Sequence, residues 1–252
     1  MDKNLVLAKI KDVLSKNSYV LSARVYGSWL HKEKAVDVDI AIIIPSQLGV
    51  VESIVYESLK ELRLNLVEEI NCDIDLIPHT IDEIEDLRSP LWYPRYNPSL
   101  CYGETIKGKF LMNSISTREK KFEFSDLTAY VLLDNRTICR RQLLRSLKDM
   151  SGRIYVSKLL HGHGNALTFY SCKNRIKYLA SPSDLEFCFR LFDEIYGVDS
   201  IPVLKFLRSC NEELDFQKAL KLMFWYENLV SLTILYKYPT SLYNSACLKN
   251  FV

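Results

Sequence analysis

The stretch VDVDIAIII, residues 36–44, decides the fold class of this 252-residue chain. It begins with alternating apolar and acidic residues, which is the pattern of a half-buried β-strand, and then stays apolar until Pro45 ends it. A strand that is apolar on both faces at its far end is typical of a sheet covered on both sides. The segment therefore predicts an interior strand of an α/β domain.

The segments on either side of this strand alternate between helical and strand patterns. Apolar residues recur at helical spacing over residues 3–16 and 50–69, while residues 19–26 and 70–77 have strand composition and end at Gly27 and Pro78. A short helix is expected to begin at Ser28. The order α-β-α-β-α-β over the first 80 residues predicts an α/β (α+β) domain with a mixed sheet.

Residues 88–108 are the most loop-like part of the chain, because they contain three prolines and two glycines. We place a domain boundary there, which gives a first domain of residues 1–108 and a second region of residues 109–252. This second region is expected to be mixed and then mainly helical, and to serve in substrate binding or dimerisation. Its predicted elements are a basic helix over 136–149, short strands over 154–158 and 166–172, and helices over 183–196, 202–209 and 216–236.

Composition excludes several classes of protein. The chain is 48% hydrophobic and 25% charged, which is too apolar for a disordered protein. No apolar run approaches the roughly 20 residues of a membrane span, and seven scattered cysteines without a C-x-x-C pair give no support to a zinc ribbon or a redox centre. We expect a soluble cytoplasmic protein with reduced thiols and no membrane partner.

Charge is distributed unevenly along the chain. Residues 1–106 hold 11 Lys and Arg against 17 Asp and Glu, whereas residues 107–180 hold 15 against 5. Within the basic section, five residues recur at near-helical spacing, and such a stripe is either a solvated helix face or a surface for a phosphate backbone. The candidate nucleic-acid-binding residues are Arg136, Arg140, Arg141, Arg145 and Lys148.

The residues that carry chemistry cluster around the deciding strand. Gly27 permits a sharp turn after the preceding strand, and Ser28 offers a hydroxyl and an amide at a helix start, where anions are favoured. Asp37 and Asp39 stand two residues apart on one strand, so both carboxylates project from the same face. Two adjacent carboxylates are unfavourable unless a cation lies between them, and hard oxygen ligands of this kind suit Mg²⁺.

A third acid is expected on a neighbouring strand, and the segment Asp73-Ile74-Asp75 supplies it. The residues alone leave Asp73 and Asp75 as alternatives for the third carboxylate, since the two stand two residues apart on one strand.

The order of these motifs resembles the nucleotidyltransferase superfamily related to DNA polymerase beta. The matching residues are Gly27, Ser28, Asp37, Asp39 and, by the Leu76 and Ile77 that follow it, Asp75, with Asp73 as the alternative if the register differs by one pleat. Tyr102–Gly108 is similar to a Y-G-E-x-I-x-G segment that follows the catalytic strands in several members. The resemblance covers about residues 1–108. It implies that the three aspartates bind Mg²⁺ or Mn²⁺, that Gly27 and Ser28 contact the triphosphate of an NTP, and that Asp75 also deprotonates the attacking hydroxyl.

The reaction expected from the resemblance is transfer of a nucleoside monophosphate from an NTP to a hydroxyl. The acceptor is RNA, a protein side chain or a small molecule, and the basic section favours RNA. The alternative is a catalytically inactive nucleic-acid-binding or regulatory protein that retains the fold, because Trp29 and Val36 depart from the residues usual in the family. A homodimer through the apolar C-terminal helices is a further expectation.

Overall fold

The computed structural model describes residues 3–32, 37–47, 49–85, 103–109, 124–145, 201–209 and 215–231, with residues 190, 193, 194 and 199. The chain divides into two compact units, one of residues 1–47 with 51–120 and the other of residues 48–50 with 121–252. The domain boundary placed after residue 108 stays a prediction. No helix of the described part is long and apolar enough to cross a membrane.

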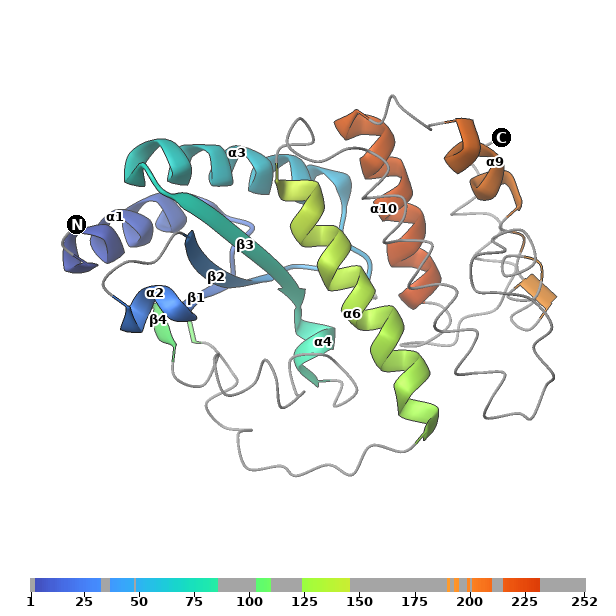
Figure 1. Ribbon diagram of the computed structural model, residues 1–252, viewed down its shortest axis with the longest axis horizontal. Helices are drawn as coiled ribbons and strands as arrows, with labels where there is room; N and C mark the ends of the chain where they lie inside the picture. Colours follow the sequence, from blue (N-terminus) through green and yellow to red (C-terminus); the bar gives the residue numbers. More distant parts are fainter. Residues whose placement is uncertain are drawn as a thin grey trace. The chain divides into compact units, whose positions relative to one another are not determined.

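The first unit is built on a four-stranded mixed sheet in the order β3-β2-β1-β4 (Figure 1). Strands β2 and β3 run parallel, whereas β1 is antiparallel to both of its neighbours. The strands are β1 (Ser22–Tyr26), β2 (Asp37–Ile44), β3 (Asp73–Thr80) and β4 (Glu104–Lys107). This arrangement confirms the predicted α/β fold class with a mixed sheet.

Helices connect these strands and supply most of the remaining core. Helix α1 (Lys3–Ser15) packs against α3 (Ser53–Ile70), and α3 forms the crossover that parallel pairing of β2 and β3 requires. The short helices α2 (Ser28–His31) and α4 (Ile81–Glu85) follow β1 and β3 directly. These helices and strands give the order that the sequence predicts for the first 80 residues.

Strand register sorts the side chains of the sheet into two different faces. Val25, Ile40 and Leu76 lie side by side on one face and are fully or almost fully buried. Because side chains alternate along a strand, the neighbouring row of Tyr26, Asp39 and Asp75 lies on the other face. One face is therefore apolar at this level, and the other carries the acidic residues.

Two features of the sheet differ from the sequence prediction. Strand β3 continues through Pro78 to Thr80, although Pro78 was expected to end it. Because β3 is an edge strand, the missing N–H of a proline removes no bond from the ladder when that position points outward. Strand β4 falls in the stretch predicted to be a loop, and it pairs with β1 at the opposite edge.

Glycines and a lysine fix β4 against the rest of the unit. A Cβ atom at Gly103 would lie 2.6 Å from the Val25 carbonyl oxygen, and one at Gly108 would lie 2.5 Å from that of Leu21. Lys107 Nζ donates to the carbonyl oxygens of Leu14 at 2.8 Å and Asn17 at 2.7 Å, at the C-terminal end of α1. Burial of this ammonium lowers the pKa of Lys107.

Replacing Lys107 with Met should destabilise the protein by about 1–3 kcal/mol, because two carbonyls at the end of α1 lose a charged donor. The free energy of unfolding, from urea titration followed by circular dichroism, measures the effect. Lys11→Met, an exposed position on α1, is the control and should stay within about 0.5 kcal/mol of the wild type. Equal stability of the two variants would contradict a capping role for Lys107.

The second unit is helical in its described part. Helix α6 (Phe124–Leu144) packs against α10 (Phe216–Val230), and α9 (Ile201–Ser209) lies between them in sequence (Figure 1). Asp215 caps α10, since its side chain accepts a hydrogen bond from the Lys218 amide at 2.8 Å. Helix α6 begins twelve residues before the predicted basic helix. The strands predicted over 154–158 and 166–172, and most of the helix predicted over 183–196, lie outside the described residues.

Candidate metal centre

Three carboxylates meet at one end of the sheet. Asp37 and Asp39 come from β2, and Asp75 comes from β3, where it is the register partner of Asp39. Each offers an oxygen atom, and these three atoms lie within 4.8 Å of one another. Asp75 is fully buried, whereas Asp37 and Asp39 are half-buried. The structure thus brings together the three aspartates that the sequence singled out.

Asp73 does not join this cluster, although it is the register partner of Asp37. Its carboxylate is bound by Arg63 of α3, whose Nη2 lies 2.8 Å from Asp73 Oδ1. The same guanidinium donates through Nε to the Ile74 carbonyl at 2.8 Å. Arg63 therefore holds Asp73 at the sheet edge, an arrangement for which the sequence gives no signal beyond one arginine in an amphipathic helix.

Gly27 lies next to Asp39 of the cluster. It follows Tyr26, the register partner of Asp39. Its φ of +82° is a backbone conformation that residues other than glycine rarely adopt. A Cβ atom at this position would lie only 2.6 Å from Asp39 Oδ2. Glycine is therefore required both by the turn and by the close approach of the carboxylate. Ser28 begins α2 immediately beyond it.

Replacing Gly27 with Ala should weaken Mn²⁺ binding at the carboxylates at least tenfold, because the added methyl group must displace Asp39 and strain the turn. Electron paramagnetic resonance of free Mn²⁺ measures the affinity. Ala8→Ser, at an exposed position of α1, is the control and should match the wild type. Wild-type affinity in Gly27→Ala would show that this contact does not position Asp39.

The donor set suits a hard divalent cation. All three candidate ligands are carboxylate oxygens, which hold Mg²⁺, Mn²⁺ or Ca²⁺ rather than soft metals. The nearby thiol does not change this, because burial first, and then the charges of Asp73 and Asp37, raise the pKa of Cys72. A protonated thiol is a poor metal ligand. The cluster can therefore hold a divalent metal ion through oxygen alone.

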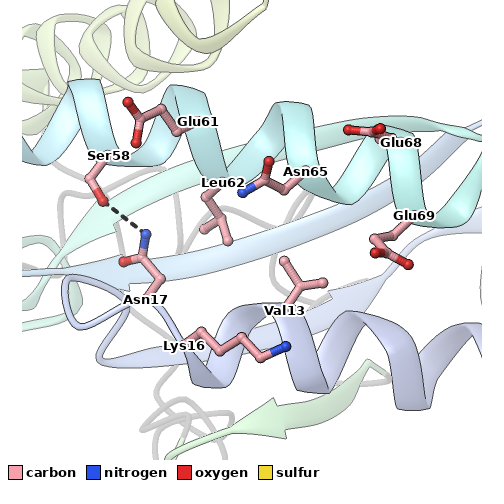
Figure 2. A pocket seen from close by; sticks show the side chains of 9 residues that line it. All are labelled: Val13, Lys16, Asn17, Ser58, Glu61, Leu62, Asn65, Glu68 and Glu69. Atoms are coloured by element: carbon pink, nitrogen blue, oxygen red, sulfur yellow. Dashed lines mark hydrogen bonds between the residues drawn. The ribbon is translucent and has the colours of Figure 1, made fainter.

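A separate cavity of about 280 Å³ lies between α1 and α3 (Figure 2). Its lining is mostly polar and includes Lys16, Asn17, Ser58, Glu61, Glu68 and Glu69. Asn17 and Ser58 satisfy one another across it, with Asn17 Nδ2 donating to Ser58 Oγ at 2.9 Å (Figure 2). None of the three clustered aspartates lines this cavity, so it is distinct from the aspartate cluster.

The predicted basic stripe is corrected for two of its members. Arg136 and Arg140 are fully buried in the second unit, where Arg140 Nη2 lies 2.7 Å from Glu227 Oε2 and Arg136 Nη1 lies 3.6 Å from the same oxygen. Their charges hold α6 to α10 and are closed to solvent. Arg141 and Arg145 are half-buried, and Lys148 lies outside the described residues.

Glu227 is the residue that the sequence analysis missed. It is the single acid in the apolar helix α10, and an isolated acid in such a helix signals a buried partner of opposite charge.

Comparison with protein-family models, with curated proteins and with solved structures gives no significant match. The fold and the geometry of the aspartates are therefore the basis for a functional assignment.

Proposed function

We propose that this protein is a Mg²⁺-dependent nucleotidyltransferase that moves a nucleoside monophosphate from an NTP to a hydroxyl acceptor. The observation that carries the proposal is the aspartate cluster packed against a glycine turn, with two carboxylates on β2 and the third on the parallel β3. The resemblance of the Gly-Ser, D-x-D and Asp75 motifs to the nucleotidyltransferase superfamily supports the same reaction.

The proposed roles follow from the positions of the residues. Asp37 and Asp39, with Asp75, would hold the metal, which supplies Lewis-acid polarisation of the phosphate oxygens when bound. The backbone amides around Gly27 and Ser28 would orient the triphosphate. The acceptor oxygen forms a bond to the α-phosphorus. At the same time the bond breaks between the α-phosphorus and the oxygen that bridges the α- and β-phosphates. Pyrophosphate leaves with that electron pair, and Asp75 takes the hydroxyl proton.

Incubation with each α-labelled NTP, Mg²⁺ and a mixed cell lysate tests the proposal. Label should enter one class of acceptor with one preferred base, and both EDTA and the Asp39→Asn variant should abolish it. Fractionation of the lysate by nuclease and protease treatment then identifies the acceptor class. Binding of NTP and RNA without any transfer of label would instead support the catalytically inactive alternative.

We propose RNA as the acceptor, on the strength of the basic section at residues 107–180, where 15 Lys and Arg face 5 Asp and Glu. Because each neutralised phosphate of single-stranded RNA releases about 0.7 counterion, replacing Arg141 and Arg145 with Gln should flatten the salt dependence of RNA binding by about 1–2 units. Filter binding between low and moderate salt measures the slope. Absence of RNA binding by the wild type at low salt would overturn the RNA acceptor and leave the transferase standing.

A further inference from the structure

An ammonium group is held against the short helix α2, which follows the Gly27 turn. Lys3 of α1 donates through Nζ to the carbonyl oxygen of Leu30 at 3.1 Å. The same nitrogen lies 5.9 Å from the centroid of the Trp29 ring, which is a cation–π distance. Trp29 itself is 8% exposed, so it forms a fixed support for the lysine.

The two groups that hold Lys3 are uncharged. Within the described part of the chain, both groups that Lys3 contacts, a carbonyl and an indole ring, are neutral. Lys16, by comparison, pairs with Asp12 at 2.6 Å, and Arg63 pairs with Asp73 at 2.8 Å. An ammonium keeps two further N–H donors after bonding one carbonyl, so Lys3 can also bind an anion.

Helix α2, which holds Lys3, connects it to the aspartate cluster. Leu30 is three residues beyond Gly27, a rise of roughly 4.5 Å in helical geometry, and a Cβ atom at Gly27 would lie 2.6 Å from Asp39 Oδ2 of the aspartate cluster. His31 and Lys32, both exposed, add basic groups at the end of the same short helix. The aspartate cluster and the ammonium of Lys3 therefore lie at the two ends of α2.

We propose that Lys3 binds the β- and γ-phosphates of the nucleoside triphosphate and stabilises the charge that develops on pyrophosphate as it leaves. This inference rests on the proposed function, since it adds a binding residue to the same site. Lys3 stays bonded to the Leu30 carbonyl throughout, and it exchanges no proton with the leaving group. Its contribution is a charge-assisted hydrogen bond to a phosphate oxygen.

Inorganic tripolyphosphate with Mg²⁺ is the probe, because it carries the phosphate chain without a base. Calorimetry should show binding by the wild type, binding about tenfold weaker for Lys3→Met, and binding within about threefold of the wild type for Lys3→Arg. Lys9→Met is the matched control, because Lys9 is another α1 lysine that donates to a backbone carbonyl, that of Glu69 at 2.9 Å. It should bind tripolyphosphate as the wild type does.

The two proposals fail in distinguishable ways. If the wild type binds Mn²⁺ and tripolyphosphate and Lys3→Met binds them equally well, the role of Lys3 is overturned and the transferase stands. If the wild type binds neither, the proposed function falls and the role of Lys3 falls with it. Mn²⁺ affinity measured without phosphate distinguishes phosphate binding by Lys3 from a role of Lys3 in maintaining the turn. It should be unchanged in Lys3→Met, and a parallel loss of Mn²⁺ and tripolyphosphate binding would show that Lys3 only maintains the turn.

Discussion

Asp39→Asn is expected to reduce nucleotidyl transfer by about a thousandfold or more while leaving the melting temperature unchanged or raised. Asp39 is half-buried beside Asp37 and Asp75, so the amide removes a metal ligand and also one of three mutually repelling charges. Asp37→Asn and Asp75→Asn should behave in the same way. Label transfer from the preferred NTP and thermal unfolding by circular dichroism are the two measurements.

Asp73→Asn is the matched control for these variants, because it lies on the same face of β3 but pairs with Arg63 instead of joining the cluster. Transfer should remain near the wild-type rate. Since the Asp73 side chain is 50% exposed, its ion pair should contribute at most about 1 kcal/mol. Loss of transfer in Asp73→Asn with activity retained in Asp75→Asn would reverse the assignment of the third carboxylate. Collapse of the fold in Asp39→Asn would favour a structural role for the cluster.

Glu227→Ala should lower the free energy of unfolding by about 3–5 kcal/mol, the largest stability effect expected in the chain. Arg136 and Arg140 are both fully buried beside this carboxylate, so its removal takes away a counter-charge that both guanidinium groups share in the interior of the second unit. Urea titration of the full chain measures the loss. Lys221→Ala, at an exposed position of the same helix, should change stability by less than about 0.5 kcal/mol.

A second variant distinguishes the effect of the charges from the effect of the volume that their side chains fill. Replacing Arg136 and Arg140 with Met together with Glu227→Leu removes all three charges while keeping apolar bulk, and should be less destabilising than Glu227→Ala alone. If the triple variant is the less stable of the two, the charges themselves stabilise the packing of α6 on α10.

The strand that carries Asp37 and Asp39 could be predicted because its pattern is local. Alternation and an apolar run define β2, and the turn residues Gly27 and Pro45 limit the segments around it. Asp75 could be chosen over Asp73 through the family resemblance, in which apolar residues follow the third acid. The lack of room for a side chain at Gly27, beside Asp39 Oδ2, could not be predicted, because it depends on pairing between two strands and not on either one.

The failures have a common cause, which is that long-range partners override local signals. Pro78 ends no strand because β3 is at a sheet edge, and β4 forms from a loop-like stretch because β1 offers it a free edge. The spacing of Arg136 and Arg140 predicts a surface stripe. Their true partner, Glu227, lies 87 residues after Arg140 and gives no signal near the two arginines. Spacing along a helix shows which residues share a side, but not whether that side meets water.

The sheet order also bears on how the chain folds. Both strands that carry the aspartates are joined by α3 within residues 37–80, whereas β4 must return to β1 across the 81 residues that separate Arg24 from Thr105. Closing a longer loop costs more chain entropy, and contacts of high sequence separation form slowly. We therefore expect the β2-α3-β3 unit to assemble early and β4 to dock late, so that a nascent chain can align its carboxylates before β4 is in place.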